Sequence, residues 1–314
     1  MVGAMSETPL RGIFVARPDT PEWFAARSTG IGASEIAAAA GLSRYSTPTE
    51  VALRKLGRLP EFEGNKFTRL GRKLEPVVVS EFAEATGRVV LHYPMPMFRH
   101  EQYACILATP DAQLCDNELL ECKTTGFQVA NAQYGDQATD DVPVEHLCQA
   151  QIQMAVCGAS IVRLACLVDG RELRLFVVQR NGDLIGELIA TACALWQLIQ
   201  AGQVPEVDWT HQSALGLVKE MHRTIVDKSI VPLSPEMQLL QARREEIGFE
   251  IRALKAEDDS RKARLLNAIG DNAAGDLGDG FVLRRKLITK EPYIVETKPY
   301  IDFRRVTRET FLKD

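Results

Sequence analysis

The sharpest chemical pattern in the sequence joins Asp111 to the tripeptide Glu121, Cys122 and Lys123. Successive side chains of a strand point to opposite faces, so Glu121 and Lys123 share one face of a strand expected at residues 118–124. A hairpin would bring Asp111, at the end of the preceding strand, beside Glu121. Two adjacent carboxylates repel one another unless a cation joins them, and Mg²⁺ prefers such oxygen ligands with water and a substrate phosphate. Lys123 could hold a water or a phosphate oxygen beside that ion. The alternative is an ordinary surface ion pair between Glu121 and Lys123.

A second candidate site comes from Arg27 and Ser34, which lie in and before a glycine-punctuated turn at residues 30–35. Arginine offers a planar fork that binds two oxygens of one phosphate. Ser34 stands where a helix is expected to begin, and the free main-chain N–H groups of a helix start attract anions. Both residues are therefore candidates for binding a phosphate, although Ser34 also suits an ordinary helix cap.

The elements that must position these residues follow from periodicity and turn signals. We expect helices that begin at Pro21 and Pro235 and helices over 36–40, 49–56, 70–86, 145–156 and 184–201. Strands are expected at 89–93, 97–99, 104–108 and 118–124, and Asp169-Gly170 predicts a hairpin of residues 161–168 with 172–179. This order predicts an α/β fold in which helices flank a mixed central sheet. Pro76 is expected in the first turn of its helix, because proline has no N–H to donate.

Three regions are expected along the 314 residues: a domain at 1–206, a linker at 207–234 and a helical and β appendage at 235–314. The long helix of the appendage has Leu240, Ile247, Ile251 and Leu254 near heptad spacing, with charged residues between them. A glycine-rich loop at 270–280 and strands at 281–288 and 293–296 are expected to follow.

Composition excludes several classes of protein. With 46% hydrophobic and 25% charged residues, the chain is neither disordered, collagenous nor a disulfide scaffold. The net charge of −5 argues weakly against a nucleic-acid binder. Residues 43–73, however, hold eight basic and three acidic residues, which would suit local binding of a polyanion or a solvated helix and loop.

The seven cysteines contain no C-x-x-C pair, which excludes a zinc ribbon and a thioredoxin-like motif. Free thiols in apolar runs predict a reduced, cytoplasmic protein. No apolar run approaches the ~20 residues that span a bilayer, so we expect no transmembrane helix and no membrane partner. The five histidines show no metal-ligand spacing and are expected to be ordinary core or surface residues.

Five motifs stand in an order that resembles one family. The pattern Pro110-Asp111, nine residues, then Glu121-x-Lys123 is that of the PD-(D/E)xK nucleases. Together with the other motifs, this pattern resembles the lambda exonuclease or YqaJ-type viral recombinase family, the phage alkaline exonucleases. The motifs are Trp23 to Arg27 with Gly30 to Glu35, Gly71 to Glu75, Thr109 to Asp111, Glu121 to Lys123, and Ala150 to Gln153.

The resemblance implies a restriction-endonuclease-like core and a role for each matching residue. Asp111 and Glu121 would bind Mg²⁺, or Mn²⁺ in its place, with the main-chain carbonyl of Cys122 as a further ligand. Glu75 would add a carboxylate for a second ion or through water. Lys123 would position the attacking water and help to deprotonate it. Arg27 and Ser34 would bind a DNA 5′ phosphate, and Gln151 would contact the substrate or support the metal ligands.

The resemblance also implies an activity and partners. The expected activity is a Mg²⁺-dependent 5′→3′ exonuclease that degrades one strand of linear double-stranded DNA and leaves 3′ overhangs for recombination by single-strand annealing. The expected partners are duplex DNA with 5′-phosphate ends, an annealing protein and two further copies in a ring-shaped homotrimer. The alternatives are a RecB-like or Cas4-like DNA repair nuclease and a non-catalytic DNA-binding ring protein on a nuclease fold.

Overall fold

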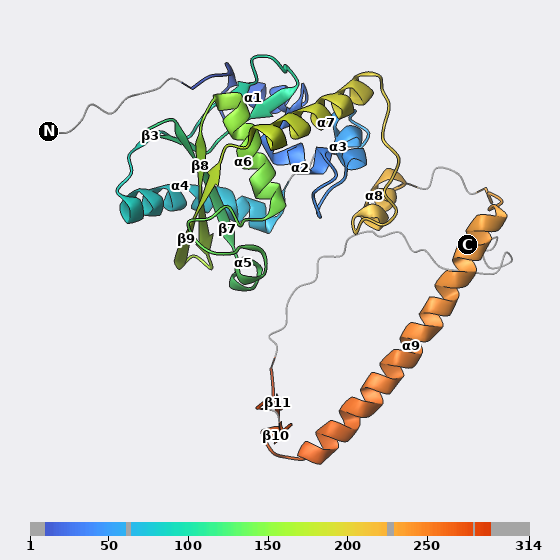
Figure 1. The fold of residues 1–314 in the computed structure, drawn as a ribbon. Coiled ribbons are helices and arrows are strands. Elements are labelled where there is room, and N and C mark those ends of the chain that lie inside the picture. Colours follow the sequence, from blue (N-terminus) through green and yellow to red (C-terminus); the bar gives the residue numbers. More distant parts are fainter. Residues whose placement is uncertain (1–9, 61–63, 225–228, 279, 290–314) are drawn as a thin grey trace. The chain divides into compact units, whose positions relative to one another are not determined.

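The computed structural model describes residues 10–60, 64–224, 229–278 and 280–289. The chain divides into two units, residues 1–223 and 224–314 (Figure 1). All residues that the sequence singles out for chemistry lie in the first unit. The expected strand at 293–296 falls outside the described residues.

The first unit contains two sheets. The larger has the strand order β3, β6, β7, β8, β9, with bounds Val90–His92, Ala112–Leu114, Glu118–Thr125, Ile161–Val168 and Glu172–Gln179. Its two central strands, β7 and β8, run parallel, whereas the other pairs are antiparallel. The smaller sheet has the order β1, β4, β5, β2, with bounds Ile13–Ala16, Met97–Arg99, Ile106–Ala108 and Ile31–Gly32. The expected α/β fold with a mixed central sheet is confirmed.

Helices cover both faces of the larger sheet because its central strands are apolar on both faces. Leu119 of β7 packs in one core cluster with Ile152 of α6 (Val144–Cys157) and Leu188 of α7 (Gly182–Gln200). Leu120, the next residue of β7, packs in a second cluster with Phe82 of α4 (Lys66–Thr86). Because successive side chains of a strand point to opposite faces, β7 lies between two helical layers. Glu121 and Lys123 stand in the second half of this strand.

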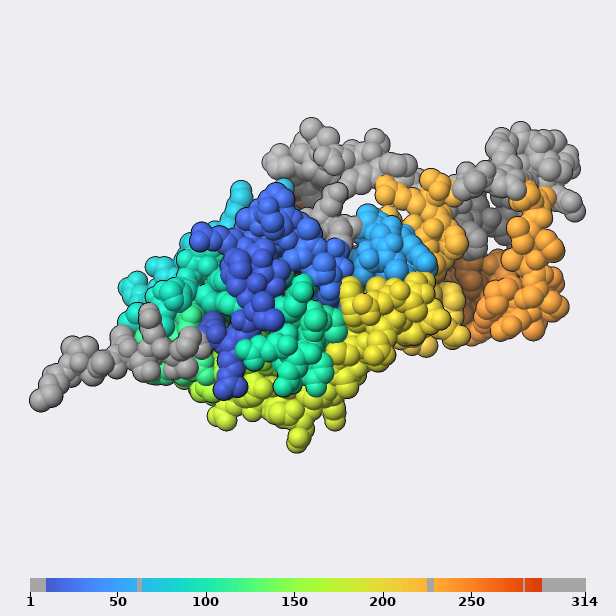
Figure 2. All heavy atoms as spheres, turned by 90° about the horizontal axis from the view of Figure 1, so that it is seen from above, coloured from blue at the N-terminus to red at the C-terminus, as the bar shows by residue number. Residues whose placement is uncertain are grey.

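The remaining helices of this unit are short. They are α1 (Pro21–Arg27), the 3₁₀ turn η1 (Ala33–Glu35), α2 (Ile36–Ala39), α3 (Pro48–Lys55), α5 (Phe127–Gln133) and α8 (Ala214–Met221). Figure 2 shows α7, in yellow, beside α3, in light blue. Caps predicted by the sequence are present: Thr20 accepts from the N–H of Trp23 at the start of α1, as a Thr-Pro helix start requires.

Several sequence expectations need correction. Pro76 lies in the interior of α4 and not in its first turn. Burial of Val78, Val79 and Phe82 against the sheet offsets the hydrogen bond that proline cannot make. The short strands β1, β2 and β6 and the helix α5 were not expected, and β6 changes the position of Asp111. That residue lies directly before β6 of the larger sheet, whereas strand β5 belongs to the smaller one.

A further correction concerns the linker expected at 207–234. Residues 214–221 form α8, and Leu217 of this helix is buried against Leu53 and Leu59. The first unit consequently extends to residue 223, beyond the expected boundary at 206. Burial of Leu217 is accompanied by a hydrogen bond from Ser213 Oγ to Glu50 Oε2 and by one between His211 Nε2 and the carbonyl of Ser43. Local periodicity could not indicate these contacts with distant residues.

The second unit begins with the long helix that the sequence predicted. Helix α9 spans Pro235–Ile269, and Ser234 caps it by accepting from the N–H of Met237. A two-stranded hairpin follows, β10 (Ala274–Asp276) with β11 (Val282–Arg284). The expected loop at 270–280 therefore includes one short strand.

Among the described helices, α7 is long and apolar enough to cross a membrane by length and composition alone. Six of its apolar residues are buried in the main core cluster, which accounts for its composition: Ile185, Leu188, Ile189, Ala192, Leu195 and Ile199.

The packing of α4 on β7 predicts a contrast between two residues of that helix. Phe82 is 1% exposed and Val77 is 44% exposed. Phe82→Ala should lower the free energy of unfolding by about 3–5 kcal/mol, since it removes a buried aromatic ring and leaves a cavity. Val77→Ala should change it by about 0.5 kcal/mol or less. Urea unfolding of both variants measures the difference, and equal effects would contradict the packing described here.

Candidate active site

The β6–β7 hairpin brings Asp111 and Glu121 together, as the sequence predicted. Ala112 pairs with Leu120 across the hairpin, so Asp111 stands opposite Glu121. Asp111 Oδ2 accepts a hydrogen bond of 2.6 Å from the main-chain N–H of Cys122. Glu121 is 2% exposed, which makes its carboxylate a buried charge that needs partners.

Three side-chain donors satisfy the Glu121 carboxylate. Its Oε1 accepts from Lys123 Nζ and from Gln149 Nε2, each at 2.6 Å. Its Oε2 accepts from Gln153 Nε2 at 2.6 Å. Lys123 Nζ also donates to Gln149 Oε1 at 3.0 Å, which closes a triangle of Glu121, Lys123 and Gln149. Strand alternation puts Lys123 on the face of Glu121, and the four-residue spacing puts both glutamines on one face of α6.

The structure does not bring Gln151 into this group. Gln151 is 2% exposed, and its amide donates to the carbonyl of Gln179 and accepts from the N–H of Asn181. It therefore holds the end of β9 and takes no part in the candidate site. Gln149 and Gln153 contact Glu121 in its place. The helical spacing of i and i+4 was the signal in the sequence that separates these two residues from Gln151.

Glu75 of α4 interacts electrostatically with the carboxylate of Glu121. Burial and then the charge of Glu121 raise the pKa of Glu75, although a hydrogen bond with Tyr93 opposes the shift. Burial and the charge of Glu75 raise the pKa of Tyr93 to about 12. Burial, followed by the charges of Glu121 and Glu75, raises the pKa of Asp111 well above its usual range. Three mutually repelling carboxylates are the expected environment of a cation. Tyr93 was not anticipated from the sequence.

Lys123 is held in its charged form. Burial by itself would lower the pKa of Lys123, but the charges of Glu121 and Asp111 outweigh burial and raise it. The ammonium group can thus donate hydrogen bonds to a water or a phosphate oxygen, and it cannot accept a proton while it stays charged. The geometry favours an orienting role for Lys123.

The donor set fits a hard divalent cation. Asp111 and Glu121 would hold it, with the main-chain carbonyl of Cys122 as a further oxygen ligand. Within the described residues, no three His, Cys, Asp or Glu side chains lie close enough to ligate one ion together. Two carboxylates completed by water match the usual coordination of Mg²⁺. Gln153 Oε1, beside Glu121, is buried and has no hydrogen-bond partner among these residues, so it could accept from a water bound to such an ion.

Arg27 is connected to the segment of Asp111 through contacts made by Trp23. The guanidinium carbon of Arg27 lies 4.9 Å from the ring centre of Trp23. The indole N–H of Trp23 donates to Thr109 Oγ1 at 3.3 Å, two residues before Asp111. Ser34 is exposed in η1, directly after β2. Ser34 follows β2, which pairs with β5 in the smaller sheet, and the chain runs from β5 through Thr109 to Asp111. Arg27 lies on α1, which contacts Thr109 through Trp23.

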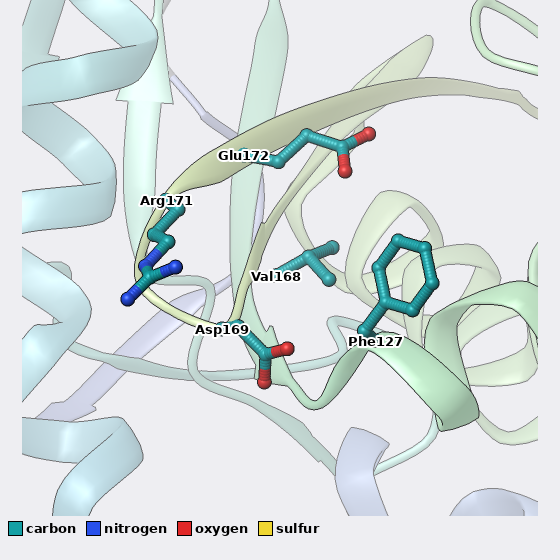
Figure 3. Close-up of a pocket in the computed structure, with 5 residues that line it drawn as sticks. All are labelled: Phe127, Val168, Asp169, Arg171 and Glu172. Atoms are coloured by element: carbon teal, nitrogen blue, oxygen red, sulfur yellow. The ribbon is translucent and has the colours of Figure 1, made fainter.

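A cavity of about 530 Å³ lies at the turn between β8 and β9 (Figure 3). Phe127, Val168, Asp169, Arg171 and Glu172 line it. None of the carboxylates described above contributes to its wall. The candidate site is therefore defined by its side-chain cluster and not by this cavity.

Comparison with known proteins agrees with the motif order. Residues 22–160 match the family model described as a YqaJ-like viral recombinase domain, and this range includes Arg27, Ser34 and the whole carboxylate cluster. These residues are similar to a YqaJ-like viral recombinase domain. The resemblance expected from the motifs is thereby confirmed.

Relatives of the YqaJ-like domain include the uncharacterized protein YqaJ of Bacillus subtilis (strain 168). It is 28% identical over 214 residues, which are 67% of this chain and 66% of that protein. The alkaline exonuclease LHK-Exo of Laribacter hongkongensis has a similar structure, with a TM-score of 0.48 and 24% identity over 58% of this chain and 94% of that one. A phage-related exonuclease of Haemophilus somnus 129PT has a TM-score of 0.42 and 15% identity over 55% of this chain and 96% of that one.

The raised pKa of Asp111 predicts how the stability of the metal-free protein depends on pH. The folded state holds its proton at a higher pH than the unfolded chain, so the free energy of unfolding falls as pH rises from the unfolded pKa toward the folded one. Asp111→Asn removes this penalty and should be more stable than the wild type at pH 8 in EDTA, with the gap closing below pH 4. Thermal unfolding across this pH range measures the effect.

The exposed residue Glu84 of α4 provides the matched control, and Glu84→Gln should show no such pH-dependent gain. Mg²⁺ should reverse the order, since it stabilises only the protein that binds it. A lower stability of Asp111→Asn at pH 8 in EDTA would contradict the electrostatic description of the site.

Proposed function

We propose that this chain is a divalent-metal-dependent exonuclease that degrades one strand of linear double-stranded DNA in the 5′→3′ direction and leaves 3′ overhangs for single-strand annealing. The observation that carries the proposal is the pair Asp111 and Glu121, brought together on one hairpin with Lys123 on the face of Glu121. The YqaJ-like viral recombinase domain supports DNA as the substrate.

The residues divide the chemistry among them. Bound Mg²⁺, with Mn²⁺ as a substitute, would polarise the scissile phosphate and lower the pKa of a bound water. Asp111, Glu121 and the carbonyl of Cys122 would hold the ion, and Glu75 would act through a bound water or hold a second ion. The Lys123 ammonium orients the attacking water or a phosphate oxygen. Gln149 keeps Lys123 and Glu121 in register, because it bonds both.

The proposal extends to end recognition and assembly. Arg27 supplies a bidentate fork for a 5′ phosphate, and Ser34 with the main-chain N–H groups of η1 supplies further donors. The motif order supports a ring-shaped homotrimer around the duplex and a single-strand annealing protein as partner.

A strand-labelled assay tests the activity. Linear duplex labelled at either 5′ or 3′ termini is incubated with the full chain in Mg²⁺, in Mn²⁺ and in EDTA. The proposal requires progressive loss of the 5′-labelled strand end, persistence of a single strand with a 3′ terminus, and no cleavage in EDTA. Tight DNA binding without cleavage in either metal would identify the non-catalytic alternative.

Variants of the cluster should separate chemistry from folding. Glu121→Gln and Lys123→Met should each lower the initial rate by roughly 100-fold or more, because they remove a metal ligand and an oriented positive charge. The matched control is Glu118→Gln on the same strand, whose buried carboxylate bonds Arg88 and Arg163 away from the site. It should lose stability but keep its rate at a temperature where it is folded. Near-normal turnover of Lys123→Met would refute its assigned role.

End recognition predicts a preference between two substrates. Duplex with 5′ phosphates should be degraded faster than the same duplex with 5′ hydroxyls. Arg27→Ala should lower the rate on the phosphorylated duplex by about 10-fold or more, the loss expected for one or two hydrogen bonds to a charged group. Initial rates on the matched substrates measure it, and an unchanged preference in Arg27→Ala would place the phosphate pocket elsewhere.

A further inference from the structure

Lys55, at the end of α3, makes two contacts that no motif of the sequence indicated. Its side chain is 3% exposed. Its Nζ donates to the main-chain carbonyl of Arg27 at 2.7 Å and to Glu35 Oε2 at 2.8 Å. Glu35 Oε2 in turn accepts from the N–H of Gly32 at 2.9 Å. One buried ammonium group thus joins α1, the turn after β2 and α3.

These contacts fix both ends of the segment that carries Arg27 and Ser34. Arg27 is the last residue of α1, where helix carbonyls lack partners within the helix and need an outside donor. Glu35 is the last residue of η1, next to Ser34. Lys55 therefore holds the helix end before the turn and the helical turn after it, and the residues between them have little freedom.

The middle of the same segment is fixed independently. The N–H of Ile31 donates to the carbonyl of Cys105 at 2.7 Å, and Ile31 pairs with Ile106 of β5. A Cβ on Gly30 would lie 2.4 Å from the carbonyl oxygen of Cys105, so only glycine allows this approach. The strand pairing sets the path of the turn, while Lys55 sets the separation of its two ends.

We propose that Lys55 is a positioning residue for recognition of the 5′ phosphate: its ion pair with Glu35 and its bond to the Arg27 carbonyl hold the Arg27 fork and Ser34 at the spacing that one phosphate group requires. This inference rests on the proposed function. Lys55 is too buried to contact the phosphate itself, and its charge is already paired with Glu35. Its effect on the substrate passes through the segment it anchors.

The test measures the preference for phosphorylated ends in Lys55→Met, Lys55→Arg and Glu35→Gln. Initial rates are measured on matched 5′-phosphate and 5′-hydroxyl duplexes, and duplex affinity is measured by fluorescence anisotropy in EDTA, where no cleavage is needed. The matched control is Arg163→Met, because Arg163 forms a part-buried ion pair with Glu118 away from this segment. Thermal unfolding sets a temperature at which each variant is folded.

We expect the ratio of the rate on 5′-phosphate duplex to the rate on 5′-hydroxyl duplex to fall by about 10-fold in Lys55→Met. This is the loss expected when one hydrogen bond to a charged phosphate is removed. Lys55→Arg should recover part of the preference, since it keeps the charge, and Glu35→Gln should lose part of it. Arg163→Met should keep the full preference despite a lower stability. The affinity ratio between the two duplexes should follow the same order.

Three results overturn the inference. If folded Lys55→Met or Glu35→Gln keeps the wild-type ratio in both rate and affinity, Lys55 does not position the pocket, and the proposed exonuclease stands. If the wild type itself shows no preference between the two ends, recognition of the 5′ phosphate fails, and the assignment of Lys55 fails with it. A preference lost equally in Arg163→Met would reduce the role of Lys55 to general stability and would also overturn the proposal.

Discussion

The buried carboxylate of Glu121 is the constraint on which the candidate site depends. A charge that is 2% exposed is costly unless hydrogen-bond donors surround it. Its donors come from its own strand, in Lys123, and from the facing helix, in Gln149 and Gln153. The site is therefore rigid before any ligand arrives, because every donor is fixed on a strand or helix of the core.

The donors do not remove the repulsion among the carboxylates. Burial and mutual charge raise the pKa values of Asp111 and Glu75 beside Glu121. One lysine does not neutralise three carboxylates, and a divalent cation would compensate the remaining negative charge. The arrangement that destabilises the metal-free protein is thus the one that prepares it to bind metal.

Helix α6 serves three regions of the molecule at once. Gln149 and Gln153 face the carboxylate, Gln151 holds the end of β9, and Ile152 lies in the core. Near its start, His146 shares a hydrogen bond of 2.9 Å with Tyr134. Burial and then the charge of Lys123 keep the pKa of His146 well below its usual value, so it adds no charge to the site. A change in the packing of this helix would reach the site, the strand end and the core together.

The sequence by itself determined the local features. The alternation of β7, the Asp-Gly hairpin, the capped helices and the pairing of Asp111 with Glu121 all depend on neighbours in the chain, and the structure contains them. The order of the motifs was enough to predict the family whose model matches residues 22–160. Tertiary structure decided the rest. Pro76 lies inside α4 because packing against the sheet outweighs its lost hydrogen bond. Helix α8 joins the first unit through burial of Leu217 and through hydrogen bonds of the residues just before the helix with residues 43 and 50. Which glutamine meets Glu121 depends on the rotation of α6 about its axis, and the role of Lys55 depends on contacts with residues 20 and 28 positions away. Such contacts are set by the packing of whole elements, because the burial that stabilises each element is shared with partners far along the chain.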